Sequence, residues 1–135
     1  MFLPRLVRQV ELVHSYEDAV YIYYDDGRMA QFLDLYVDAG IDALMTLTPP
    51  PMGDVVPEDA KSRFGDRVCL VGGVDAVKEI HLSNPKDIRD TVRRRLDILR
   101  PGGAYIMDGS NSLVWETPAE NVRAFVDAGV EFGGY

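Results

Sequence analysis

The stretch YIYYDDG, residues 21–27, joins an aromatic run to two carboxylates and a glycine. Residues 19–24 (AVYIYY) are rich in β-branched and aromatic side chains, a composition typical of a buried strand. Asp25, Asp26 and Gly27 follow directly, and residues 28–39 then show the spacing of an amphipathic helix. This change from strand to polar loop to helix within a few residues indicates an α/β unit.

The same unit recurs along the chain. We predict further strands at 42–48, 67–72 and 104–108, and helices at 3–15, 28–39, 57–64, 86–99 and 117–128. Strands that alternate with helices are joined by crossovers and are therefore parallel. Because nearly every strand position is apolar, we expect both faces of the sheet to be covered. The sequence thus predicts four parallel βα units in a single domain, residues 1–135.

A few residues predict where helices begin or end. Gly40 ends the 28–39 helix, because glycine tolerates the left-handed conformation that follows a helix end. Asn84 suits the N-cap of the 86–99 helix, and Pro85 suits its first turn. Thr117 and Glu120 have the spacing of a capping box at the start of the last helix.

Composition excludes several classes of partner. The net charge of −8 argues against nucleic acid and against anionic membrane surfaces, both of which need clustered Lys and Arg. No apolar stretch approaches the ~18–20 residues that span a bilayer, and residues 1–14 lack the pattern of a secretory signal. We therefore expect a cytoplasmic protein with no nucleic-acid or membrane partner.

The candidate site lies where the strands end. In parallel α/β folds the strand-to-helix loops gather beyond the carboxyl ends of the strands, and ligands bind there. The four predicted ends are residues 24–27, 46–49, 72–75 and 107–111, and Asp and Gly recur at three of them. The candidate catalytic residues are Asp26, Asp108 and Asn111. The candidate substrate-binding residues, with Tyr24 and Met52 as walls, are Tyr24, Asp25, Gly27, Met52 and Asp75.

These residue types have structural roles as well. Asp, Asn and Gly are common in turns, and carboxylates favour helix N-termini. Several carboxylates in one mouth could instead raise each other's pKa for acid–base chemistry or bind a divalent cation. No spacing matches a defined metal signature and no phosphate-binding or CxxC motif is present, so the sequence indicates neither a metal nor a cofactor.

Other polar residues look structural. His81 falls after the third predicted strand, where a solvated loop histidine is expected. The basic run at 93–95 lies in the middle of a predicted helix and is interpreted as a solvated outer face or a contact surface.

Several short motifs, in order, resemble one family. They are the DG after the first strand, AGIDAL (39–44), PPPMGD (49–54), KxxxGDR (61–67), LVGGVD (70–75), PGGAYI (101–106), TPAENVRAF (117–125) and a closing FGGY. On these motifs the chain is similar to the uroporphyrinogen decarboxylase superfamily, which also holds the corrinoid-linked methyltransferases. The resemblance implies a (β/α)8 TIM-type barrel, of which this chain resembles the last four units, the C-terminal half.

The resemblance implies two reaction classes, decarboxylation of a porphyrinogen and transfer of a methyl group. In the decarboxylases the principal aspartate and the arginines that hold the substrate belong to the other half of the barrel. Those enzymes also contribute a histidine after the last strand, at a position that is about Asn111 here. The methyltransferases hold zinc with a His-x-Cys-Gly element, which here reads YDDG at 24–27. The expectation is a decarboxylase-like protein that is not competent as an isolated chain. The alternatives are a methyltransferase-like subunit and a non-catalytic half-barrel.

The resemblance also bears on partners. Four strands cannot close such a barrel, and they leave sheet edges that invite pairing. We expect either a homodimer through the exposed sheet edges, which we favour, or pairing with a separate chain that carries an N-terminal half-barrel. A small-molecule ligand at the rim is compatible with both.

Overall fold

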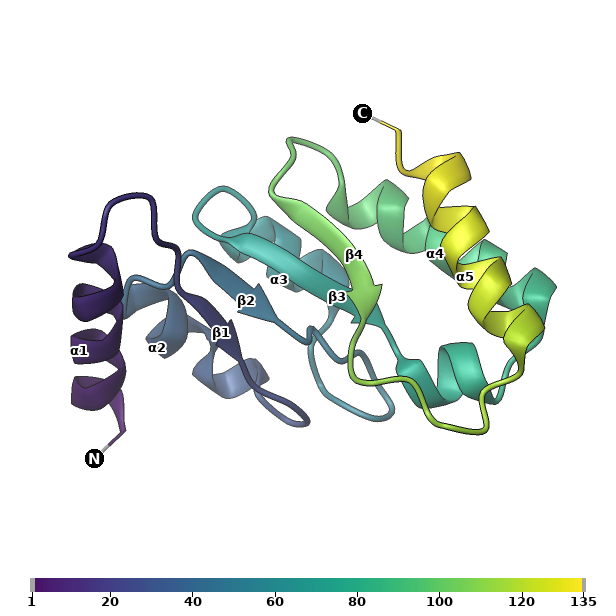
Figure 1. The fold of residues 1–135 in the computed structure, drawn as a ribbon, viewed down its shortest axis with the longest axis horizontal. Helices are drawn as coiled ribbons and strands as arrows, with labels where there is room; N and C mark the ends of the chain where they lie inside the picture. The colour runs from purple at the N-terminus through teal and green to yellow at the C-terminus, as the bar shows by residue number, and fades with distance from the viewer. Residues whose placement is uncertain (1, 135) are drawn as a thin grey trace.

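Four parallel strands form one sheet in the order β1-β2-β3-β4 (Figure 1). The computed structural model describes residues 2–134. In chain order its elements are α1 (Leu3–His14), β1 (Ile22–Tyr24), the 3₁₀ helix η1 (Ala30–Phe32), α2 (Leu33–Asp38), β2 (Ala43–Met45), α3 (Pro57–Phe64), β3 (Cys69–Val74), the π-helix η2 (Ala76–His81), α4 (Pro85–Leu99), β4 (Tyr105–Gly109) and α5 (Ala119–Phe132). The prediction of an α/β fold with four parallel βα units is confirmed.

The strand register decides which side chains enter the core. Residues opposite one another on neighbouring strands point to the same face, and the next row points to the other. One row consists of Tyr23, Leu44, Leu70 and Tyr105. Three of these residues are buried in the main hydrophobic core, and Tyr23 packs against it. The helices α3 and α4 lie behind this face of the sheet (Figure 1).

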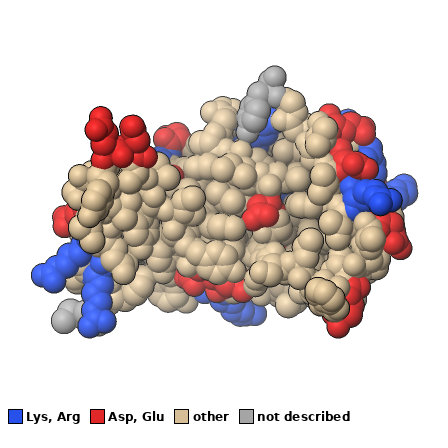
Figure 2. All heavy atoms as spheres, in the orientation of Figure 1, with Lys and Arg blue, Asp and Glu red and all other residues tan. Residues whose placement is uncertain are grey.

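The other face of the sheet is open. Its central row consists of Tyr24, Met45, Val71 and Ile106, and none of these belongs to the main core. Tyr24 and Ile106 are 51% and 55% exposed, and Ile22 in the adjoining position is 54% exposed. Figure 2 shows mostly uncharged atoms across the middle of this view, with one acidic group near the centre. The expectation that both faces are covered is therefore wrong for residues 2–134.

Helix α4 shows how the covered face is built. The Asn84 side chain accepts a hydrogen bond from the backbone N–H of Asp87, and Pro85 occupies the first turn, as predicted. Ile88, Val92 and Leu99 then follow at helical spacing and are fully buried. Burial of each such side chain contributes about 1.5–3 kcal/mol. This amphipathic stripe fixes α4 against β3.

Some predicted boundaries differ because local geometry intervenes. Strand β2 ends at Met45 because Thr46 takes a φ of 81°, which a strand does not accommodate. The predicted capping box is wrong: α5 begins at Ala119 after Pro118, with no side-chain cap. The Thr117 hydroxyl instead lies 3.3 Å from Nδ1 of His81. His81 is the last residue of the π-helix η2 and not the loop residue that the sequence had indicated.

No helix within residues 2–134 is long and apolar enough to cross a membrane. Helix α1 instead packs at the β1 end of the sheet through the buried residues Leu6 and Val10 (Figure 1).

An aspartate ties α1 to the sheet. Oδ2 of Asp42 lies 2.7 Å from Nε2 of His14 and accepts a hydrogen bond from the backbone N–H of Tyr21 at 2.6 Å. The hydrogen bonds from His14 and from the Tyr21 backbone lower the pKa of the Asp42 carboxyl below its usual value. The carboxylate form is therefore favoured in the folded chain.

We expect Asp42→Asn to lower the free energy of unfolding at neutral pH by at most about 1 kcal/mol, because the pair is partly exposed. A lowered folded pKa contributes stability that is complete above the ordinary value of 3.8 and is lost as pH falls through the folded value. The difference from the wild type should thus shrink below pH 3.8 in urea titrations. Asp66→Asn, at an exposed carboxylate after α3, is the control. A difference that grows on acidification would contradict this assignment.

Candidate functional site

The carboxyl ends of the strands enclose a cavity of about 150 Å³. Its lining comes from the loops after all four strands: Asp26, Gly27, Thr48, Met52, Asp75, Ala76, Val77 and Asn111. Five of the eight residues expected from the sequence are among them, namely Asp26, Gly27, Met52, Asp75 and Asn111. The parallel direction of the strands brings these distant segments together.

Asp26 and Asn111 form the polar centre of the cavity. Nδ2 of Asn111 donates to Oδ2 of Asp26 at 2.5 Å, and the Thr48 hydroxyl donates to Oδ1 of Asp26 at 3.2 Å. The Tyr24 hydroxyl donates to Oδ1 of Asn111 at 3.2 Å, so Tyr24 joins the cluster without lining the cavity. The cluster fixes the orientation of the Asp26 carboxylate, which can accept hydrogen bonds from a ligand.

A contact between Tyr24 and Asn111 connects the two outer strands of the sheet. Tyr24 belongs to β1 and Asn111 follows β4, and these strands are separated by β2 and β3. Three strand spacings on a flat sheet would measure roughly 14 Å. The loop after β4 shortens this span because it crosses the strand ends: the Ser110 hydroxyl donates to the carbonyl of Leu47, which follows β2, at 3.2 Å. The cavity lies at these strand ends.

Asp75 has a structural role in addition to its place in the lining. It is buried, and its Oδ1 accepts hydrogen bonds from the backbone N–H groups of Val77 and Lys78 at 2.9 and 2.5 Å. These bonds cap the N-terminus of η2, where a carboxylate is favoured. One carboxylate oxygen is thus committed to the cap.

Besides Tyr24, two of the expected residues lie outside the cavity. Oδ2 of Asp25 accepts a hydrogen bond from the Tyr36 hydroxyl at 2.6 Å, on the covered side of the sheet. Burial, reinforced by this hydrogen bond to the carboxylate, raises the pKa of Tyr36 well above its usual value, so the phenol stays protonated and donates. Asp108 lies within β4, opposite Gly73, and does not line the cavity.

Thr48 is the lining residue that sequence reasoning overlooked. It follows β2 and is buried, and its single hydroxyl proton is shared between the Thr46 carbonyl at 2.8 Å and Oδ1 of Asp26 at 3.2 Å. Thr48 falls within residues 46–49, one of the predicted strand ends, so its place in the fold is predictable. The sequence gives no indication of where its hydroxyl points, because the residue stands between a strand and the three prolines at 49–51.

An ion pair behind the cavity holds the loop that carries Asp75. Nε of Arg95 donates to the Gly73 carbonyl at 2.6 Å, and a terminal nitrogen donates to Oε1 of Glu79 at 2.9 Å. Oε2 of Glu79 accepts from the backbone N–H of Asp75 at 2.8 Å. The two ion-paired side chains are only 14% and 23% exposed. The interpretation of residues 93–95 as a solvated face is therefore wrong for Arg95.

The charge of the cavity restricts its ligands. Its lining includes two carboxylates and no Lys or Arg. Such a surface favours hydrogen-bond donors and cationic groups over anions. Within residues 2–134 no group of three His, Cys, Asp or Glu side chains is placed to hold a metal ion. The two carboxylates of the lining suit a ligand that presents N–H or O–H donors.

Comparison with known proteins identifies the relatives of the chain. Residues 1–132 match the family model described as uroporphyrinogen decarboxylase. The uroporphyrinogen decarboxylase of Methylococcus capsulatus is 31% identical over 111 residues, which cover 82% of this chain and 29% of that protein. That of Chromohalobacter salexigens is 30% identical over 98 residues, covering 73% and 26%. The chain thus spans between a quarter and a third of the length of these relatives.

A solved structure supports the fold. A methyltransferase from Methanosarcina mazei superposes with a TM-score of 0.77 over 99% of this chain and 36% of its own. The sequence identity is 22%, so the likeness shows a shared fold. The resemblance noted in the sequence motifs is confirmed.

Replacement of Arg95 tests the support of the Asp75 loop. We expect Arg95→Met to lower the free energy of unfolding by about 2–4 kcal/mol, because Glu79 and the Gly73 carbonyl lose a largely buried partner. Arg94→Met, at an exposed neighbour, should change it by less than about 0.5 kcal/mol. Urea unfolding gives both values. A double variant Arg95→Met/Glu79→Gln should be less destabilised than the sum of the singles, and strict additivity would contradict the coupling.

Proposed function

The chain belongs to the uroporphyrinogen decarboxylase family, and we propose that it works as a half-barrel subunit. In this proposal a second copy covers the open face of the sheet, and the Asp26–Asn111 cavity then binds a tetrapyrrole-type ligand through the ligand's N–H groups. The isolated chain does not carry out decarboxylation.

The open sheet face is the observation that carries the proposal. On that face the outer-strand residues Ile22, Tyr24 and Ile106 are each more than half exposed, whereas Val71 on β3 is buried. Burial of apolar surface is the main driving force of association. Within residues 2–134, β1 and β4 each have one strand neighbour, so each presents an unpaired edge. An exposed apolar face with two free edges is a surface that natural proteins cover.

A second copy fits these edges. Two curved four-stranded sheets related by a two-fold axis along the strands place β4 of each copy beside β1 of the other, with all eight strands parallel. An apolar groove of about 470 Å³ lies beside β4, lined in part by Ile106, Met107, Phe125 and Val130. This groove provides apolar cover for the neighbouring strand of the second copy.

The chemistry of the cavity supports ligand binding and opposes decarboxylation by this chain alone. Relatives in the family are named for uroporphyrinogen, a macrocycle that carries several carboxylate groups as well as pyrrole N–H groups. Asp26 can accept from N–H groups, but the cavity lining has no Lys or Arg to hold the carboxylates. Zinc-dependent methyl transfer has less support, because the Tyr24, Asp26 and Asn111 cluster offers neither thiolate nor imidazole.

Solution mass tests the association. We expect light scattering during size-exclusion chromatography to give about 30 kDa at micromolar concentration, twice the chain mass of 15.1 kDa. Ile106→Glu places a charge on the open face and should give the monomer mass, with the helical circular dichroism retained. Leu12→Glu, at an exposed position of α1, should leave the dimer intact. A well-folded wild-type monomer would refute the proposal.

Ligand binding tests the cavity. Uroporphyrin, the stable oxidised form of the macrocycle, is fluorescent, and its titration with the dimer should show saturable binding. We expect Asp26→Asn to weaken binding about tenfold or more, because a charged acceptor for the ligand's N–H groups is lost. Asp25→Asn is the matched control, since that carboxylate faces Tyr36 on the other side of the sheet. Tighter binding by Asp26→Asn would mean that Asp26 repels the ligand, and would sink this assignment.

A further inference from the structure

Trp115 projects from the loop between β4 and α5 with almost no cover. It is the single tryptophan of the chain and is 95% exposed. Leu113 in the same loop is also exposed. A large aromatic side chain held in water contributes nothing to the core of its own chain, whereas tryptophan is enriched among the residues that dominate protein interfaces. This exposure points to a contact outside the copy to which it belongs.

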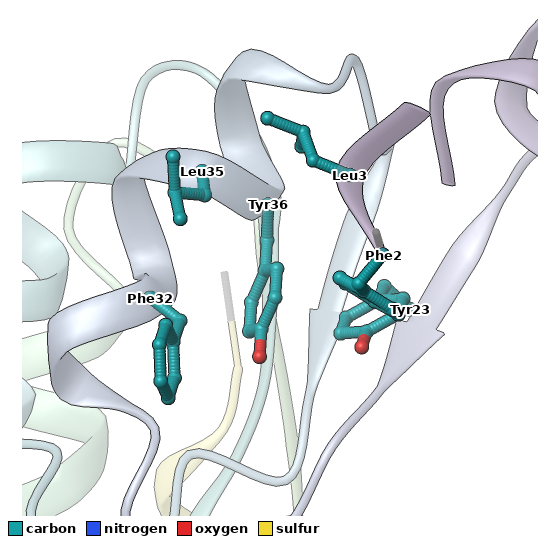
Figure 3. A pocket seen from close by; sticks show the side chains of 6 residues that line it. All are labelled: Phe2, Leu3, Tyr23, Phe32, Leu35 and Tyr36. Carbon is teal, nitrogen blue, oxygen red and sulfur yellow. The ribbon is translucent and has the colours of Figure 1, made fainter. Parts of the chain in front are cut away.

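An aromatic trough lies at the opposite edge of the sheet. It has a volume of about 380 Å³ and is lined by Phe2, Leu3, Tyr23, Phe32, Leu35 and Tyr36. Figure 3 shows Phe32 and Leu35 on one side, Tyr36 in the middle, and Leu3, Phe2 and Tyr23 on the other. The ring centroids of Tyr23 and Tyr36 are 4.5 Å apart, and that of Phe32 is 6.3 Å from that of Tyr36. The trough therefore offers aromatic faces and edges to a flat side chain.

Trp115 does not occupy the trough of its own copy, because its side chain is 95% exposed. The trough adjoins β1 and the loop of Trp115 follows β4, and these are the two outer strands of the sheet (Figure 1). In the dimer proposed above, β4 of one copy lies parallel to β1 of the other. The loop after β4 then lies beside the loop after β1, which leads to Phe32 and Tyr36. The pairing brings the exposed indole to the trough.

Charges next to the two surfaces are complementary. Glu116 follows Trp115 and is exposed, and Arg5 lies three residues after Phe2, which places it on the same side of α1. Neither Glu116 nor Arg5 has an ion-pair partner in the part of the chain that the structure describes. Opposite charges beside an apolar contact favour that contact over others.

We propose that Trp115 of one copy inserts into the aromatic trough of a second copy, with Glu116 of the first facing Arg5 of the second. The inference rests on the proposed dimer and names the contact that orients it. By the two-fold symmetry the same contact forms twice. It locks the loop that carries Asn111, and so links association to the shape of the Asp26–Asn111 cavity.

The fluorescence of the single tryptophan tests the contact directly. As protein concentration is raised, we expect the emission maximum to shift to shorter wavelength, and quenching by acrylamide to fall, in step with the dimer mass from light scattering. Leu35→Asp, in the trough wall, should abolish the shift and weaken the dimer. Leu12→Asp, at an exposed position of α1 outside the trough, should change neither, and circular dichroism confirms that both variants are folded.

A charge exchange tests the orientation. Glu116→Arg and Arg5→Glu should each weaken dimerisation about two- to fivefold, and the double variant should restore it, because it re-forms the pair with the charges reversed. A dimer in which Trp115 stays fully accessible to acrylamide would overturn this inference and leave the proposed function standing. Absence of any dimer would overturn both. An emission shift in assemblies larger than a dimer would support the Trp115 contact and overturn the closed two-copy barrel.

Discussion

The period of two along parallel strands is the constraint on which this molecule depends. Tyr23, Leu44, Leu70 and Tyr105 share one row, and the helices cover it. The same alternation then forces Tyr24, Val71 and Ile106 onto the opposite face, where no helix within residues 2–134 follows. A slip of one residue would exchange the two sets. One choice of register therefore fixes both the core and the open face. Burial of the Leu44 and Leu70 row stabilises this register, and Tyr24 and Ile106 are then left exposed on the other face.

The same alternation separates the two carboxylates that follow β1. Asp25 continues the side of Tyr23 and meets the Tyr36 hydroxyl among the helices, whereas Asp26 continues the side of Tyr24 and meets Asn111 at the cavity. The period of two along the strand places these carboxylates on opposite faces, and the tertiary fold then decides which of the two faces the helices cover.

Other features could not be read from the sequence, because each depends on a partner far along the chain. The starts of α3 and α4 were predictable, since Pro57, Asn84 and Pro85 act locally. Arg95 is the last residue of a basic run, and only the approach of η2 and β3 gives it Glu79 and the Gly73 carbonyl as partners. Thr117 has the spacing of a capping residue, but α5 begins at Ala119 after Pro118 and has no side-chain cap. The cavity depends on the four strand ends, which the sequence indicated. It also depends on the paths of the loops that follow them, which the sequence did not indicate.

Asp108 connects the fold to the proposed chemistry. Among the strand residues on the open face it is the charged one, two residues from Ile106 on the same side of β4. Covering that face with a second copy places two such carboxylates in the interior, close beneath the cavities that hold Asp26. Buried carboxylates need donors or cations as partners. A ligand with N–H groups at its centre meets that need, whereas its own carboxylates require positive charge that neither cavity lining supplies. Under the proposed function, Asp26 and Asp108 would supply acceptors for the ligand's N–H groups, and groups outside this cavity would supply the positive charge for its carboxylates.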